Sequence, residues 1–149
     1  MDAPDAIVMD DDERDEFLGT GGTGVISLAP TESGPPHAIP VSYGYDAAAR
    51  TFYFRLAVDP DSEKGDLAGR PATFVAYGND DGRWRSVVAR GRLESTTGES
   101  IGTETLEGLE AVHIPLVDIF GRPPRQVPFE FYRLVPDELT GRKESTTRA

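Results

Sequence analysis

The feature of this sequence that most constrains its fold is an alternation of apolar and other residues with a period of two, interrupted at short intervals by turn residues. Residues 51–58 show it most clearly, because their side chains divide between two faces of an extended chain. The apolar face holds Phe52, Phe54, Leu56 and Val58, and the mixed face holds Thr51, Tyr53, Arg55 and Ala57. A second such run at residues 37–45 and the short loop 46–50 complete the pattern of a β-hairpin.

Six segments of this kind, separated by Gly, Pro, Asn, Asp or Ser, predict six β-strands. They are residues 24–29, 37–45, 51–58, 72–77, 84–94 and 129–135. Gly91, inside the fifth segment, predicts a bulge or a bend at a barrel corner. Hairpins joined in this way are antiparallel, and closure of the sheet removes its exposed edges. The pattern therefore indicates an all-β-dominated barrel or sandwich with small helices.

Three short helices are predicted between or before the strands. The first lies within residues 10–18, with acidic residues in its first turn, and the others lie at 63–68 and, more weakly, at 104–111. Glycines at positions 19, 21, 22 and 24 follow the first helix. This cluster lacks the Gly-Lys-Ser/Thr ending of a phosphate-binding loop and follows a helix instead of a strand, so we predict a flexible connection.

The chain is strongly acidic, with 26 Asp and Glu residues against 15 Lys and Arg residues and a formal charge of −11. Phosphates are repelled by such a surface, so nucleic acid is not an expected partner. Only Lys64 and Lys143 are lysines. Acidic excess with scarce lysine is typical of proteins from salt-loaded cytoplasms such as those of haloarchaea. The alternative is an ordinary acidic protein with a disordered acidic tail.

The ends of the chain are more polar than its middle. Residues 1–15 are expected to form an acidic, partly disordered leader, residues 16–136 the folded domain, and residues 137–149 a polar C-terminal tail. The acidic start is the reverse of a secretory signal, and no apolar run is long enough to span a membrane. We therefore expect a soluble, cytoplasmic protein with no membrane contact.

Side chains that carry out catalysis unaided are scarce. There is no cysteine, and the two histidines, His37 and His113, have no metal-ligand spacing, so no metal site is expected. The sequence has neither a Gly-x-Ser-x-Gly motif nor a Rossmann glycine fingerprint. His113 is expected to be structural, with a proton donor as the alternative. An enzyme with this sequence would need a cofactor to carry the reaction.

Arg55 and Lys64 are candidates for a phosphate site. Arg55 lies near the end of its predicted strand on the mixed face, and Lys64 opens the following helix. At such a place backbone N–H groups and basic side chains together hold a phosphate. The alternative is that both residues form surface pairs with Asp59, Asp61 or Glu63.

The order and spacing of these segments resemble the pyridoxamine 5′-phosphate oxidase-like family of FMN-binding split barrels, in its compact form. The resemblance covers about residues 17–94, and the strand at 129–135 fits the same architecture. It implies an antiparallel, six-stranded, Greek-key-like split β-barrel and a homodimer with the flavin site at the subunit interface. It also implies an FMN-dependent oxidoreductase acting on a small molecule.

The resemblance assigns cofactor contacts to the predicted strands at 37–45, 51–58 and 84–94 and to the start of the predicted helix at 63–68. These contacts are Pro40, Val41, Ser42, Tyr43, Arg55, Leu56, Ala57, Lys64, Trp84, Ser86 and Val87. The first four would pass along the flavin ring and ribityl chain. Arg55, Leu56 and Ala57 would flank the phosphate and the pyrimidine edge, and Lys64 would contact the phosphate. Trp84, Ser86 and Val87 would come from the partner subunit. The alternatives are that Val41 and Tyr43 are barrel wall and that Trp84 anchors the dimer core.

The sequence departs from the oxidases of this family in several respects. Lys64 stands alone where the oxidases show adjacent basic residues, and the chain is shorter, so oxidation of pyridoxamine phosphate itself is not expected. The segment Gly141-Arg142-Lys143 is expected to be solvated, with a phosphate or substrate contact as the alternative. Two other functions stay open. One is a binding or storage module for a flavin, a deazaflavin or haem, and the other is a barrel that binds no flavin.

Overall fold

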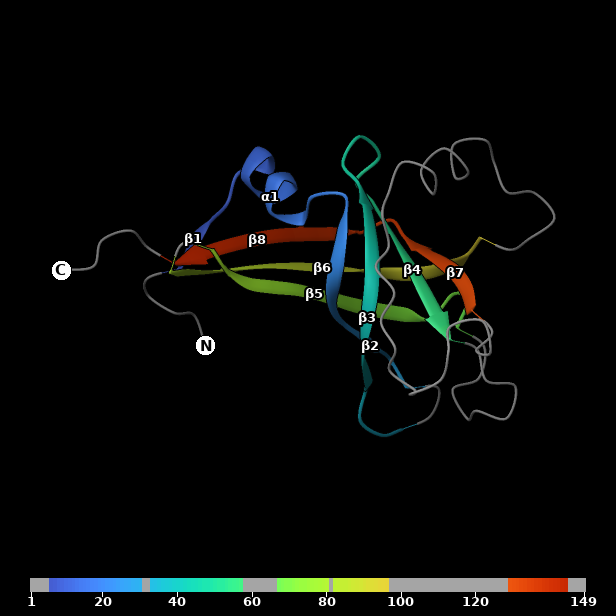
Figure 1. Cartoon of the computed structure of the whole chain (residues 1–149). Helices are drawn as coiled ribbons and strands as arrows, with labels where there is room; N and C mark the ends of the chain where they lie inside the picture. Colours follow the sequence, from blue (N-terminus) through green and yellow to red (C-terminus); the bar gives the residue numbers. More distant parts are fainter. Residues whose placement is uncertain (1–5, 31–32, 58–66, 81, 97–128, 145–149) are drawn as a thin grey trace.

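The computed structural model of the chain describes residues 6–30, 33–57, 67–80, 82–96 and 129–144 (Figure 1). It contains eight strands and one helix in these ranges: β1 (Ala6–Val8), α1 (Asp11–Leu18), β2 (Gly21–Leu28), β3 (His37–Asp46), β4 (Thr51–Ala57), β5 (Pro71–Asp80), β6 (Arg83–Ser95), β7 (Phe129–Leu134) and β8 (Glu138–Glu144). All strand pairs are antiparallel. The predicted helices at 63–68 and 104–111, together with Lys64 and His113, lie outside the described residues.

Six of the strands close into a barrel. The order is β6-β5-β2-β3-β4-β7, and β7 pairs back onto β6 to complete the ring. After the meander β2-β3-β4, the chain returns to place β5 beside β2, which is the Greek-key arrangement. The prediction of a mostly β, six-stranded antiparallel barrel is therefore confirmed. β8 and β1 extend the sheet beyond β6.

The inward face of the barrel is filled with aromatic side chains. Tyr43, Tyr45, Phe52, Phe54 and Phe74 are all buried, and the ring centroids of neighbouring pairs lie 4.7 to 6.3 Å apart. Such tilted and offset contacts are favourable for the ring quadrupoles. The predicted apolar face of residues 52–56 is thus the core face of β4.

Three of the four glycines after α1, at positions 21, 22 and 24, lie in strand β2 and not in the flexible connection that the sequence predicted, whereas Gly19 ends α1. Gly22 and Gly24 lie on the inward face of β2. A Cβ at Gly22 would be 3.2 Å from the Tyr43 ring, and one at Gly24 would be 2.5 Å from the Val75 carbonyl oxygen. The glycines are therefore required because other residues fill the space where their side chains would be.

Two segments expected to lie in a leader and a tail form strands. Residues 6–8 pair with β8, and residues 138–144 pair with β6. The tail was predicted because residues 138–144 are polar. A strand can be polar where backbone hydrogen bonds hold it and no other layer covers its outer face, and in the described part of the chain this is the case for β8. Its inward-facing Gly141 leaves room for Met9, whose Cε would lie 2.7 Å from a Cβ at that position.

Gly91 marks the point where β6 changes partner. β6 pairs with β8 through Arg90 and with β7 from Leu93, while its register with β5 continues through Gly91 without interruption. The bulge that the sequence offered as one possibility is therefore absent from the β5–β6 ladder. A Cβ at Gly91 would be 2.9 Å from Leu134 Cδ1, so close approach of the chain explains the glycine.

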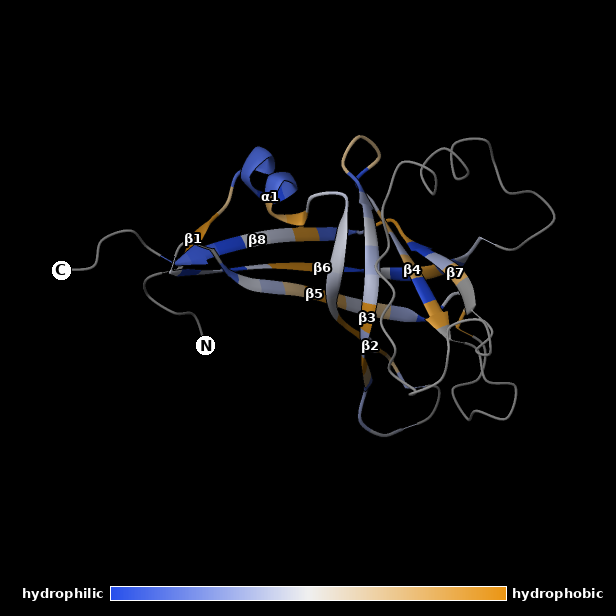
Figure 2. Cartoon of the chain, viewed as in Figure 1, coloured by the Kyte–Doolittle hydropathy of each residue, from blue (hydrophilic) through white to orange (hydrophobic). Residues whose placement is uncertain are grey.

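Helix α1 lies against the extension formed by β6 and β8 (Figure 1). Asp10 caps it by accepting a hydrogen bond from the Glu13 backbone N–H at 2.8 Å, and acidic residues occupy its first turn, as predicted. Most of the helix is hydrophilic (Figure 2). In the described part of the chain, no helix has the length and apolar character that a membrane span requires.

Candidate functional site

The outer face of β3 and β4 brings together two of the predicted site residues. Ser42 and Arg55 are register partners on these neighbouring strands, so their side chains lie on the same face. Ser42 is buried and Arg55 is half-buried. Burial lowers the pKa of the Arg55 guanidinium, which nevertheless stays charged. A partly desolvated cation beside a hydroxyl is suited to binding an anion, because charge-assisted hydrogen bonds strengthen as water is removed.

The next row on the same face contains a residue that sequence reasoning did not select. Tyr53 pairs with Gly44 on one side and with Arg133 on the other, and it is only 3% exposed. Burial, and then the charge of Asp46, raise the pKa of Tyr53, while Arg133 lowers it. The hydroxyl is therefore protonated at neutral pH and available as a donor. The signal was present in the sequence, because Tyr53 shares the mixed face of its strand with Arg55.

Four predicted contacts have side chains that point into the barrel. Val41, Tyr43, Leu56 and Val87 are all buried in the core. The Tyr43 hydroxyl donates a hydrogen bond to the Leu18 carbonyl oxygen at 2.9 Å. Since these side chains form the barrel wall, only the main-chain atoms at these positions are candidate contacts for a ligand on the outer face.

The remaining predicted contacts divide between two places. Pro40 is exposed on β3, two residues before Ser42, and Ala57 ends β4. Trp84 and Ser86 lie on the outer face of β6, which β5 and β2 separate from β3. Within one chain the structure therefore does not place Trp84 and Ser86 beside the Ser42–Arg55 pair.

An apolar surface covers the outer face of β2, β5 and β6. Val25, Val75 and Val88 form one register row and are half-buried, while Tyr77 and Trp84 are 60% and 53% exposed. The rings of Tyr77 and Trp84 lie 6.3 Å apart. We call these five residues the outer apolar face. Next to it, a pocket of about 150 Å³ between β6 and β8 is lined by Ser86, Val88, Arg90, Glu138, Thr140 and Arg142.

The closed, six-stranded antiparallel barrel, with its sheet continued by β8 and β1, is the architecture of a split-barrel protein. The sequence model of the pyridoxamine 5′-phosphate oxidase family matches residues 10–143. The chain belongs to this family, which confirms the resemblance found in the sequence.

Solved structures share the fold. A candidate pyridoxamine 5′-phosphate oxidase from Corynebacterium glutamicum is 20% identical, with a TM-score of 0.66 and coverage of 94% of this chain and 98% of that chain. An FAD binding protein from Mycobacterium smegmatis is 18% identical, with a TM-score of 0.64 and coverage of 92% and 97%. An FAD-binding protein from Mesorhizobium loti is 19% identical, with a TM-score of 0.63 and coverage of 94% and 99%. No curated protein matches the sequence.

Proposed function

We propose that this protein binds FMN between two copies of the chain and acts as a flavin-dependent oxidoreductase on a small molecule. Three things support flavin binding: the family, the fold shared with two proteins described as FAD-binding, and the outer face of β3–β4. The observation that carries the proposal is the Ser42–Arg55 pair, where a half-buried guanidinium and a hydroxyl share one face.

In this proposal the Ser42–Arg55 pair receives the flavin phosphate. Arg55 supplies a planar set of N–H donors, and the hydroxyl of Ser42 adds a further donor. Lys64 follows β4 in the sequence and is proposed as the second cation, on the strength of the sequence pattern alone. Backbone groups of Val41 and Tyr43 would run beside the ring, because their side chains face the core.

A second copy of the chain supplies the rest of the proposed site. Exposed Trp84 and Tyr77 beside a row of valines form a contiguous apolar surface of the kind that partners cover. A two-fold dimer uses the same patch on both copies. The proposed flavin site requires Trp84 and Ser86 of one copy to lie near β3–β4 of the other, because β5 and β2 separate them within a single chain.

The flavin supplies the electron-transfer chemistry when bound, and the protein positions it. Tyr53, protonated and buried on the same face as Arg55, is the chain's candidate for holding a proton near the reacting molecule. The alternative function is a binding or storage module without turnover. It is favoured by the ion pair between Arg133 and Glu94 at 2.6 Å, because this pair engages an acidic group and a basic group that lie close to Tyr53.

Ligand titration tests the phosphate assignment. FMN, FAD and riboflavin are titrated into the wild type and Arg55→Ala at high salt, with Arg50→Ala, in the exposed β3–β4 turn, as the matched control. We expect Arg55→Ala to weaken FMN more than about tenfold and to leave riboflavin unchanged, because riboflavin has no phosphate. Equal losses for FMN and riboflavin, or no binding of any flavin, would contradict the assignment. Tighter binding of FAD than of FMN would overturn the choice of cofactor.

Reduction under anaerobic conditions separates the enzyme from the storage module. When the flavin-loaded protein is mixed with NADH or NADPH, bleaching of the flavin absorbance supports an oxidoreductase with that donor. An unchanged spectrum with both donors favours binding without turnover.

A further inference from the structure

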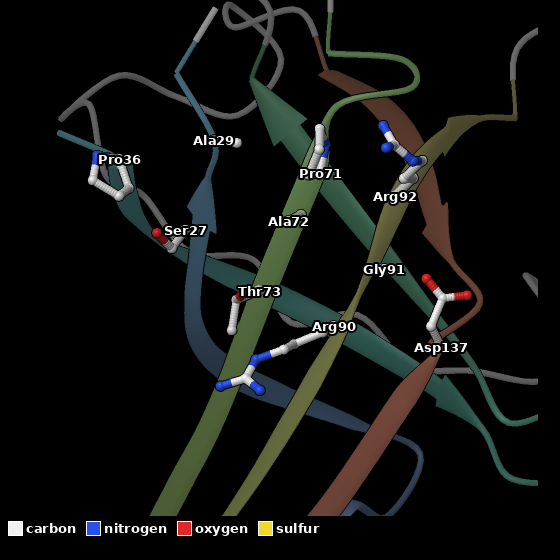
Figure 3. Close-up of a pocket in the computed structure, with 10 residues that line it drawn as sticks. All are labelled: Ser27, Ala29, Pro36, Pro71, Ala72, Thr73, Arg90, Gly91, Arg92 and Asp137. Atoms are coloured by element: carbon white, nitrogen blue, oxygen red, sulfur yellow. The ribbon is translucent and has the colours of Figure 1, made fainter. Parts of the chain in front are cut away.

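Strand β6 carries arginines on both of its faces, and the surroundings of the two faces differ. On the outer face, Arg90 and Arg92 line a pocket of about 370 Å³, in which their guanidinium groups point away from each other (Figure 3). On the opposite face, Arg85 lies in one register row with Gly78 of β5 and Lys143 of β8. Helix α1 packs against this second face (Figure 1). Two cationic residues of the row therefore belong to the face that an acidic helix covers.

Helix α1 crosses this row of three residues. Glu13 pairs with Lys143 at one end of the row. Phe17, four residues further along the helix, lies over Gly78 at the other end, where a Cβ would be 3.9 Å from its ring. Leu18 is the only apolar side chain of α1 that is buried. Contacts between charges therefore make a large contribution to the packing of this helix.

The charges of α1 are unbalanced. From its N-cap to its last turn, the helix contains six carboxylates and one cation, Arg14, which pairs with Asp11 and Asp15. Asp12 and Glu16 are exposed and four residues apart, a spacing at which like charges destabilise a helix. Glu16 also lies in the last turn, which has no basic residue and where the helix dipole disfavours a carboxylate. Repulsion between exposed carboxylates therefore opposes the packed helix.

Salt acts unequally on the repulsive and the attractive interactions. The screening length falls from about 10 Å at 0.1 M salt to about 3 Å at 1 M. Neighbouring positions on a helix surface are about 5–6 Å apart, so their repulsion is screened within this range of salt. The two Arg14 pairs are 2.8 and 3.0 Å long and the Arg14 side chain is only 5% exposed, so these pairs persist. Salt therefore removes more repulsion than attraction.

We propose that α1 is a strap that closes on the barrel as ionic strength rises. At low ionic strength, repulsion between the carboxylates opens the helix locally while the barrel stays folded. At high ionic strength, the ion pairs of Glu13 and Arg14 hold the helix over β6 and β8. The proposal does not rest on flavin binding, because none of these residues belongs to the proposed flavin site.

Hydrogen exchange of backbone amides in the full-length protein tests the strap, at about 0.05 M and about 1 M KCl and with correction for the intrinsic exchange rate in each salt. The Arg14 N–H donates to the Asp10 oxygen and the Gly19 N–H to the Asp15 oxygen, both at 3.0 Å. We expect the protection of these two amides to rise with salt at least about fivefold more than that of amides in β5 and β6. Unchanged or lower protection at high salt would overturn the proposal. An equal change in α1 and in the barrel would also overturn it, because the response would then be global.

Glu16→Gln separates the repulsion from other effects of salt. The variant loses an exposed carboxylate of the last turn, so protection of the Gly19 amide should rise about two- to threefold at low salt and gain less from added salt. Glu138→Gln is the matched control, since it removes an exposed carboxylate at the start of β8 and should leave the protection of α1 unchanged. Unchanged or lower protection in Glu16→Gln, or an equal rise in both variants, would contradict the strap.

Discussion

The helix-covered extension of the barrel and the outer apolar face share strand β6. The extension contains many hydrogen bonds and ion pairs, whereas the outer apolar face is exposed to solvent. At the helix, Arg14 is only 5% exposed and is ion-paired with Asp11 at 2.8 Å and with Asp15 at 3.0 Å. On the outer face, Tyr77 and Trp84 present their rings to solvent. The helix side satisfies its polar groups within one chain. The outer face leaves apolar area uncovered, as expected of a surface that a second copy covers.

The bonding around α1 reaches the barrel at several points. The Tyr45 hydroxyl donates to Asp15 at 2.7 Å, and Lys143 of β8 pairs with Glu13. Met9 N donates to the Gly141 oxygen at 2.8 Å, so β8 and α1 hold each other in place. We therefore expect substitutions at α1 to affect folding and substitutions on the outer apolar face to affect the proposed dimer.

The largest expected effect comes from removing Arg14, the buried cation of the ion pairs at α1. Arg14→Ala should lower the free energy of unfolding by about 3 kcal/mol, because it leaves the Asp15 carboxylate without its buried cation. Arg90→Ala is the matched control, since it removes an arginine from an exposed pair with Glu138 and should cost less than about 0.5 kcal/mol. Urea unfolding followed by circular dichroism measures both. Similar losses in the two variants would remove the distinction between the regions.

A substitution on the outer apolar face should weaken the association of the two copies. Trp84→Ala should raise the dissociation constant of the proposed dimer by about 30-fold, which corresponds to about 2 kcal/mol for a central aromatic residue. The stability of the folded monomer should change by less than about 0.5 kcal/mol, because the ring is mostly exposed. Analytical ultracentrifugation over a dilution series measures the dissociation. A wild-type protein that stays monomeric at all concentrations would contradict the shared flavin site.

Alkaline pH should reduce the stability that comes from the contacts between α1 and the barrel. Burial raises the pKa of Tyr43 to about 12, and burial together with the hydrogen bond to Asp15 raises the pKa of Tyr45 to about 12. The stabilisation from these two hydroxyls is complete below the ordinary tyrosine pKa of 10.0, since folded and unfolded chains are then both protonated. It is lost as pH rises from there toward 12, because the unfolded chain releases its protons first.

Tyr45→Phe isolates this effect. The variant should lose about 1 kcal/mol at neutral pH with the hydrogen bond to Asp15, and its stability should fall less steeply with alkaline pH. Unfolding midpoints measured at a series of pH values give both quantities. Tyr77→Phe, on the exposed face, should follow the wild-type profile, and a steep alkaline loss retained by Tyr45→Phe would show that other groups cause it.

The sequence was sufficient for the parts of the fold that depend on apolar alternation. The run Phe52, Phe54 and Leu56 identified the core face of β4 and left Arg55 on the opposite face. The start of β2 at residues 21–23 and the whole of β8 were missed, since Gly22 and Gly141 are small because distant residues fill their space. That information is not local in the sequence.

The candidate site shows the same limit. Alternation placed Arg55 on the outer face, but its pairing with Ser42 depends on strand register. The separation of Trp84 from that pair depends on strand order, because β5 and β2 intervene. The burial of Arg14 likewise depends on β8, more than a hundred residues away in the chain, because a Cβ at Gly141 would lie only 3.3 Å from Arg14 Cγ. Local patterns indicate which residues face outward, and only the fold shows which of them meet.

The smallest expected effect concerns the contact between α1 and β8. Gly141→Ala places a Cβ 2.7 Å from Met9 Cε, the flexible end of a side chain, so Met9 moves and the cost should stay near 1 kcal/mol. A double-mutant cycle with Met9→Ala tests the contact, because the alanine at 141 should cost less once Met9 is shortened. Additive losses in the cycle would show that Met9 does not fill the space over Gly141. A coupling of at least about 0.5 kcal/mol would confirm that Met9 packs in the space over Gly141, where the segment before α1 contacts β8.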